Sequence, residues 1–131
     1  MIYVDTSAFL AILADDDAYH ATAQQTWQSL LETGEVLATN NYELVESIAI
    51  IQNRGGLKSI QRMQSELLPA IEIDWLDPEQ HETAVSNVLT ANRRNLSLVD
   101  CSSFQTMRRN SIQTVFTFDE HFKERGFTVI P

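Results

Sequence analysis

Two acidic residues follow predicted strands of this sequence at their carboxyl ends. Asp5 ends the apolar segment 2–4, and Asp119 closes the apolar segment 114–118. Ligands of open α/β sheets bind beyond the carboxyl ends of the strands, so these carboxylates lie where a site is expected. An Asp at such a position is also commonly the cap of the next helix. Position alone therefore leaves a structural and a functional interpretation open.

Further acids lie near predicted helix starts. Asp100 follows Ser97 at the spacing of a capping box, a pattern that by itself favours a structural role. Glu43 and Glu46 are one turn apart on a face away from the apolar stripe, where a solvated surface is the alternative for both. Periodicity does not choose between these two glutamates. Asp74 also follows a strand, but we expect that strand in an outer position and exclude this residue.

Carboxylates that converge from separate elements repel one another unless a positive group lies among them. Mg²⁺ or Mn²⁺ is the natural partner, because these hard cations prefer oxygen ligands and retain several waters. Such an ion can activate a water molecule and hold a phosphodiester, which the acids alone would repel. The acids therefore predict metal-dependent hydrolysis of a phosphodiester bond.

Strand and helix patterns alternate along the whole chain. The segments predicted as strands are 2–4, 35–39, 71–75, 114–118 and 127–130. The segments between them have apolar residues at helical spacing, and Gly55-Gly56 is expected to break the helix that begins after Asn40. This alternation predicts a three-layer α/β sandwich with a mainly parallel central sheet of about five strands. With no repeat or linker, residues 1–131 are expected to form a single domain.

Charge and composition exclude several classes of protein. Nine Lys and Arg against eighteen Asp and Glu give a net charge of −9, which argues against nucleic-acid binding by bulk charge. The lone Cys101 excludes an internal disulfide and a thiolate zinc site. No apolar run approaches the roughly 20 residues of a membrane span, and no signal-peptide pattern is present, so we expect a cytoplasmic protein. The basic residues that remain as candidate phosphate contacts are Arg54, Lys58, Arg62, Arg93, Arg94, Arg108 and Arg109.

Four segments of the chain resemble PIN-domain nucleases, and among these the VapC-like toxins of prokaryotic toxin–antitoxin pairs. The segments are Val4-Asp5-Thr6-Ser7-Ala8-Phe9, Asn41-Tyr42-Glu43-Leu44-Val45-Glu46, Leu96-Ser97-Leu98-Val99-Asp100-Cys101 and Thr117-Phe118-Asp119-Glu120-His121-Phe122. The likeness covers essentially the whole chain, including the segment 125–127 ahead of the last strand. It implies a PIN-like nuclease domain over residues 1–131.

The resemblance also implies a site and an activity. The implied metal-binding and catalytic acids are Asp5, Glu46, Asp100 and Asp119. Glu43 then becomes a cap or a neighbour, and the hydroxyls of Thr6 and Ser7 would orient a carboxylate or a metal-bound water. The implied activity is Mg²⁺- or Mn²⁺-dependent endoribonuclease cleavage of structured RNA. A small antitoxin protein and a homodimer are implied as well.

Competing interpretations make different use of the same residues. A catalytically silent PIN-like module that binds protein or RNA would employ the acids only as helix caps. A haloacid-dehalogenase-like phosphatase resembles the chain less, because Ser7 stands where that family has a second aspartate. No Ser-His-Asp signature, glycine-rich phosphate loop or His-Glu-x-x-His motif is present. Of the three histidines, His121 lies next to Asp119 in the sequence and is expected at the surface.

Overall fold

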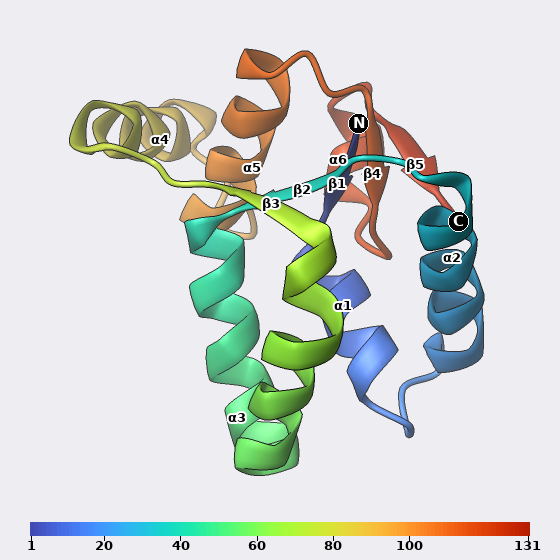
Figure 1. Cartoon of the computed structure of the whole chain (residues 1–131). Helices are drawn as coiled ribbons and strands as arrows, with labels where there is room; N and C mark the ends of the chain where they lie inside the picture. Colours follow the sequence, from blue (N-terminus) through green and yellow to red (C-terminus); the bar gives the residue numbers. More distant parts are fainter.

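The computed structural model describes all 131 residues and contains a five-stranded sheet (Figure 1). The strands are β1 (Ile2–Val4), β2 (Leu37–Asn40), β3 (Ile71–Asp74), β4 (Thr114–Phe116) and β5 (Thr128–Ile130). Their order in the sheet is β3-β2-β1-β4-β5, and all neighbouring strands are parallel. The predicted α/β class and parallel sheet are confirmed.

Helices occupy the connections between the strands. They are α1 (Thr6–Leu13), α2 (His20–Thr33), α3 (Asn41–Arg62), the short η1 (Met63–Leu67) and η2 (Leu68–Ala70), α4 (Pro78–Ala91), α5 (Leu98–Arg109) and α6 (His121–Glu124). Predicted caps are present: Asp77 and Ser97 each form a capping box, and Gly34 ends α2 in the left-handed conformation. None of the helices combines the length and the apolar character that a membrane span requires.

The helices cover the two faces of the sheet and bury two apolar clusters. Ile2 and Val4 of β1 pack into a cluster with residues of α1, α2 and α3. Tyr3, between them, points to the other face and packs with residues of α5 and α6. Side chains of a strand alternate between faces, so this central strand anchors both layers of helices. Figure 1 shows α4 on the outer side of α5, away from the sheet.

The break expected at Gly55-Gly56 is present as a kink at Gly56, after which a second helical segment follows directly. α3 continues to Arg62, with Gly56 alone in a non-helical conformation (φ 70°, ψ −166°). That backbone region is open essentially only to glycine. The helix resumes at once because Ile60 and Met63 continue its apolar side into the same cluster as Ile51.

β1 lies at the point where the direction of the chain across the sheet reverses. From β1 the chain passes to β2 and β3 on one side, and it returns to β4 on the other side. In open parallel sheets, ligands bind in the crevice outside the carboxyl ends of strands at such a point. A ligand site is therefore expected at the residues that follow β1 and β4.

Candidate metal centre

Asp5 follows β1 and caps α1 with one of its two carboxylate oxygens. Its Oδ2 accepts hydrogen bonds from the Ser7 N–H at 3.1 Å, the Ser7 hydroxyl at 2.6 Å and the Thr117 hydroxyl at 2.8 Å. The residue is only 4% exposed. Because Oδ2 holds three donors, the carboxylate has a fixed orientation, and Oδ1 has no hydrogen-bond partner. Asp5 is thus a cap that retains a free oxygen.

Thr117 joins the end of β4 to the end of β1, and sequence reasoning did not single it out. Besides contacting Asp5, its Oγ1 accepts a hydrogen bond from the Asp119 N–H at 2.9 Å. The Phe118 N–H donates to the Ser7 hydroxyl at 2.9 Å. These contacts bring Asp119 to the same sheet edge as Asp5. The only signal in the sequence was a hydroxyl residue near the carboxyl end of the predicted strand 114–118, which in the structure directly follows β4.

Asp100 combines the predicted capping role with a place near the other acids of the expected site. We call Asp5, Glu46, Asp100 and Asp119 the acidic cluster. Its Oδ2 accepts from the Ser97 N–H at 3.1 Å, and the Ser97 hydroxyl accepts from the Asp100 N–H at 3.0 Å. Its side chain is 14% exposed. Partial burial raises the pKa of Asp100 against the lowering effect of the Ser97 hydrogen bond, and the charge of Asp119 raises it further. The cap therefore does not remove this carboxylate from the cluster.

Glu46, on the first turns of α3, is half-buried and forms no ion pair, and its carboxylate interacts with the Thr6 hydroxyl. Partial burial raises its pKa first, and the charges of Asp5 and Asp100 raise it further, with a smaller contribution from Asp119. An acid that is influenced by all three aspartates lies among them. The four acids that the resemblance implied thus lie in one region of the structure, and among them Asp100 and Asp119 have ligand atoms within 4.8 Å of each other.

Glu43 is fully buried, so the solvated face considered for it from the sequence is wrong. Its Oε2 accepts from the Thr6 N–H at 2.8 Å and from the Thr6 hydroxyl, and its Oε1 accepts from the Ser103 hydroxyl. The Tyr3 hydroxyl donates to Ser103 at 2.9 Å. Burial and the nearby charge of Asp5 raise the pKa of Glu43 well above its usual range. Glu43 is therefore a buried neighbour of Asp5 that contacts Thr6 and Ser103 inside the protein.

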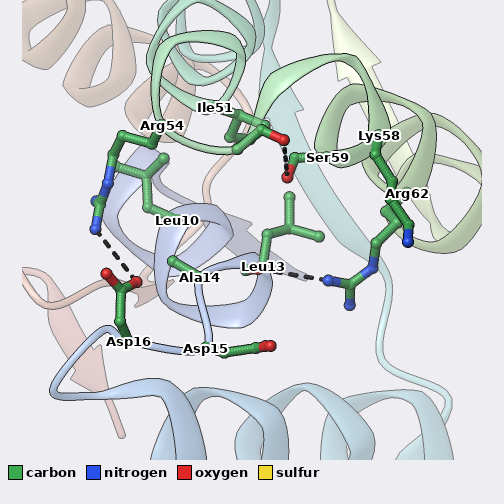
Figure 2. A pocket seen from close by; sticks show the side chains of 11 residues that line it. Leu10, Leu13, Ala14, Asp15, Asp16, Ile51, Arg54, Lys58, Ser59 and Arg62 are labelled. Atoms are coloured by element: carbon green, nitrogen blue, oxygen red, sulfur yellow. Dashed lines mark hydrogen bonds and ion pairs between the residues drawn. The ribbon is translucent and has the colours of Figure 1, made fainter.

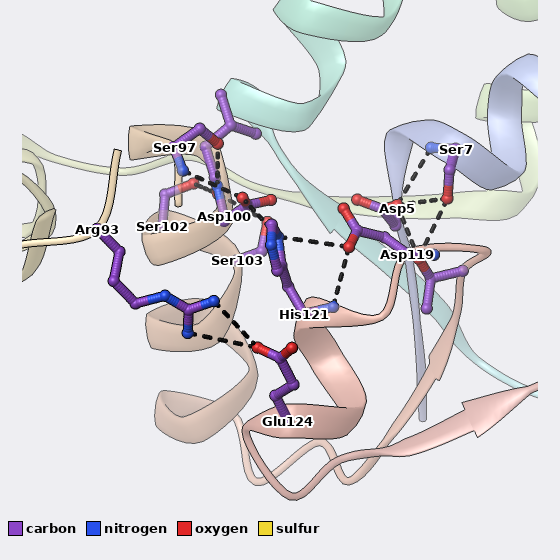
Figure 3. A network of polar contacts seen from close by, with 12 residues as sticks. Asp5, Ser7, Arg93, Ser97, Asp100, Ser102, Ser103, Asp119, His121 and Glu124 are labelled. Atoms are coloured by element: carbon purple, nitrogen blue, oxygen red, sulfur yellow. Dashed lines mark hydrogen bonds and ion pairs between the residues drawn. The ribbon is translucent and has the colours of Figure 1, made fainter. Parts of the chain in front are cut away.

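His121 is largely buried, contrary to the expected surface position. Its side chain is 18% exposed, and its Nδ1 lies 3.2 Å from an Asp100 oxygen and 3.4 Å from an Asp119 oxygen (Figure 3). One ligand atom from each of these three residues lies within 4.8 Å of the other two. The surface expectation failed because α6 turns the His121 ring back toward the start of α5, a tertiary contact that local sequence does not encode.

The donor set of this cluster fits a divalent cation. Oxygen atoms of several carboxylates converge, and burial, followed by the charges of neighbouring acids, raises the pKa values of Glu46 and Asp100. No Lys or Arg forms an ion pair with Asp5, Glu46, Asp100 or Asp119. Hard cations such as Mg²⁺ and Mn²⁺ are bound by such oxygen ligands. A positive ion is the group that this arrangement lacks.

Most of the basic residues that the sequence offered as phosphate contacts are engaged away from the acidic cluster. The ion pairs are Arg54 with Asp16, Arg62 with Glu66, Arg93 with Glu124 and Arg109 with Asp74. The last pair also shows Asp74 engaged by another group, consistent with its exclusion. Lys58, Arg94 and Lys123 form no ion pair and remain available for an anionic ligand.

A cavity of about 350 Å³ between α1 and α3 is separate from the acidic cluster (Figure 2). Arg54 and Asp16 pair across its mouth at 3.9 Å, and Arg62 donates to the Leu13 carbonyl oxygen. None of the four clustered acids lines it. Its arginines thus support the local structure rather than the acidic site.

A second cavity, of about 470 Å³, borders the acidic cluster directly. Its lining includes Asp119, Lys123 and Phe118, and Tyr19 stacks on Phe118 with ring centroids 4.6 Å apart. Lys123 is therefore a cation without an ion pair next to an acid of the cluster. A ligand that reaches the acids from this side would pass an ammonium group and an exposed aromatic ring.

Comparisons with known proteins agree over the full length of the chain. The family profile described as PIN domain matches residues 2–128. Two relatives from Mycobacterium tuberculosis strains, each described as "23S rRNA-specific endonuclease VapC20", are 30% identical over 131 residues, covering 99% of this chain and 98% of each relative. A crystal structure of M. tuberculosis VapC20, described as a sarcin-ricin loop cleaving toxin, matches with a TM-score of 0.85 and 28% identity. It covers 98% of this chain and 97% of that one.

Proposed function

The chain belongs to the PIN domain family, and from this premise we propose that it is a metal-dependent endoribonuclease acting as the toxin of a toxin–antitoxin pair. The observation that carries the proposal is the convergence of acids from separate elements at the carboxyl ends of β1 and β4. The similarity to VapC20 over almost all of both chains supports the same activity.

Asp5, Glu46, Asp100 and Asp119 are the residues that would hold the cation, for which Mg²⁺ and Mn²⁺ are the candidates. When bound, a divalent cation supplies charge that lowers the pKa of water and offsets negative charge on the scissile phosphate. The hydroxyls of Ser7 and Thr117 keep the Asp5 carboxylate in one orientation. Such fixed orientation matters, because catalytic constellations lose activity when their carboxylates are loosely held.

Structured RNA is the proposed substrate, with ribosomal RNA as the first member of that class to test. The relatives described as VapC20 are named for 23S rRNA, and this chain shares their length and fold. A net charge of −9 does not attract RNA as a whole, so local cations must hold it. Lys123 beside Asp119, and Arg94 ahead of α5, are positioned to contact phosphates.

A small antitoxin protein and a second copy of the chain are the proposed partners, in the cytoplasm, with residues 1–131 as one nuclease domain. Large apolar side chains, among them Trp75 at 65% and Leu89 at 73% exposure, are available for such contacts. Light scattering after size exclusion tests the dimer, for which twice the chain mass of 14.9 kDa is expected.

The experiment that tests the activity is cleavage of a ribosomal RNA fragment by purified protein. We expect defined cuts with Mg²⁺ or Mn²⁺, none after chelation with EDTA, and none with Asp100→Asn. Glu72→Gln, a change on β3 away from the cluster, is the matched control and should cleave normally. Cleavage that persists in EDTA would contradict metal dependence. RNA binding without any cleavage would favour the silent binding module instead.

A further inference from the structure

His121 places a buried nitrogen atom in the acidic cluster with no hydrogen-bond partner. The Nδ1 atom has less than 1 Å² of accessible surface, and neither neighbouring carboxylate meets it with hydrogen-bond geometry. A buried polar atom without a partner destabilises the fold, so such atoms in folded proteins need an explanation. One such explanation is that the atom binds a group that is not part of the polypeptide.

The spacing around Nδ1 is that of atoms that share a metal ion. It lies 3.2 Å from Asp100 Oδ2 and 3.4 Å from Asp119 Oδ1. Ligand atoms roughly 2.1 Å from one ion lie about 3 Å apart when they occupy adjacent positions. A hydrogen bond from a protonated ring would give similar distances, but it would also give a donor pointed at an oxygen, and that geometry is missing.

We propose that His121 Nδ1 is a direct ligand of the divalent cation, together with Asp100 and Asp119, and that this nitrogen makes the site prefer Mn²⁺ to Mg²⁺. The inference rests on the proposed metal-dependent nuclease. Imidazole is a good ligand for transition metals, whereas Mg²⁺ favours carboxylates and water and gives up its waters reluctantly. A single nitrogen among oxygens therefore strengthens Mn²⁺ binding more than Mg²⁺ binding.

Pulsed electron paramagnetic resonance of the Mn²⁺-loaded protein detects directly whether a histidine nitrogen is bound to the ion. We expect nitrogen modulation typical of a coordinated imidazole in the wild type, and its conversion to the ¹⁵N pattern when all histidines carry ¹⁵N. The modulation should vanish in His121→Asn and persist in the matched control His81→Asn, whose ring contacts Tyr42 on another part of the molecule. The labelled wild type needs no variant, so the test stands even if His121→Asn folds poorly.

Metal affinity provides a second readout that does not depend on activity. Calorimetry should show that His121→Asn weakens Mn²⁺ binding about tenfold and Mg²⁺ binding less than about threefold. Mn²⁺ bound to the wild type without nitrogen modulation would overturn the assignment of His121 and leave the proposed metal-dependent nuclease intact. No Mn²⁺ binding by the wild type would overturn both.

Discussion

The Oε2 atom of Glu43 accepts a hydrogen bond from the backbone N–H of Thr6 at 2.8 Å. Thr6 directly follows Asp5, so this contact fixes the start of α1 against the first turn of α3. The other oxygen of Glu43 accepts from Ser103 on α5. One buried carboxyl group therefore joins the three helices that carry Asp5, Glu46 and Asp100.

Truncation of Glu43 should lower the stability of the fold. In Glu43→Ala, the Thr6 N–H and the hydroxyls of Thr6 and Ser103 lose their acceptor inside the protein, and a cavity is left. We expect the free energy of unfolding to fall by about 3 kcal/mol. Urea denaturation followed by circular dichroism measures this change. Glu43→Gln keeps the shape and one acceptor and should cost much less; equal losses in both variants would contradict the hydrogen-bond explanation.

Removal of the Glu46 charge should abolish RNA cleavage while the fold remains intact. The carboxylate forms no ion pair, and Gln keeps its size and an oxygen for the Thr6 hydroxyl, so Glu46→Gln removes a cation ligand at little structural cost. We expect the cleavage rate to fall on the order of 100-fold or more, against less than about tenfold for Glu43→Gln. Single-turnover cleavage of a labelled RNA measures both. The reverse order of effects would mean that Glu43, not Glu46, faces the cation.

Burial of the acids, together with their mutual repulsion, should make the metal-free protein less stable as the pH rises. Folding raises the pKa of Glu46 and of Asp100, so the folded chain binds these protons more tightly than the unfolded chain does. Their contribution to stability is therefore lost as the pH rises from about 4, the ordinary carboxyl range, through the raised values. Glu46→Gln removes one of the two groups.

We expect the melting temperature of Glu46→Gln to match that of the wild type near pH 4 and to exceed it at pH 7, both in EDTA. The comparison between the two proteins cancels the titration of distant carboxylates. A difference that shrinks with rising pH would show that the folded state does not disfavour the ionised Glu46 carboxylate.

Lys123 should contribute to RNA binding because it is the unpaired cation beside Asp119. Lys123→Ala should weaken binding to an RNA fragment and reduce the slope of log affinity against log salt by roughly the share of one phosphate contact. Lys58→Ala is the matched control, since Lys58 lines the separate cavity between α1 and α3. Fluorescence anisotropy at several salt concentrations measures both slopes. Equal effects of the two changes would exclude a specific role for Lys123.

Local pattern predicted the parallel sheet and placed Asp5 and Asp119 after two of its strands, while the choice of Glu46 over Glu43 came from the family resemblance. Parallel strands share one carboxyl edge, so residues directly after β1 and β4 converge once the strand order is right. The helix caps were also predictable from the sequence, because Ser97 and Asp100 are only three residues apart and contact each other. The break at Gly56 was predictable as well, because a glycine pair interrupts the helical pattern there.

The burial of Glu43 and His121 was not predictable from the sequence. Helical periodicity places Glu43 on the polar face, but that face packs against Thr6 and Ser103, whose hydroxyls make a polar interior. His121 meets Asp100 only because α6 folds back on α5. Both contacts depend on how helices distant in the sequence pack, and hydroxyl residues carry no periodic signal of that packing.

Calorimetric titration of the metal-free protein with Mn²⁺ tests the acidic metal site most directly. The wild type should bind Mn²⁺ with a dissociation constant in the millimolar range or tighter. Asp5→Asn, which preserves the hydrogen bond from Ser7 through the amide oxygen, should show no binding while it melts cooperatively. Binding by Asp5→Asn at the wild-type affinity, or no binding by the wild type, would contradict the account.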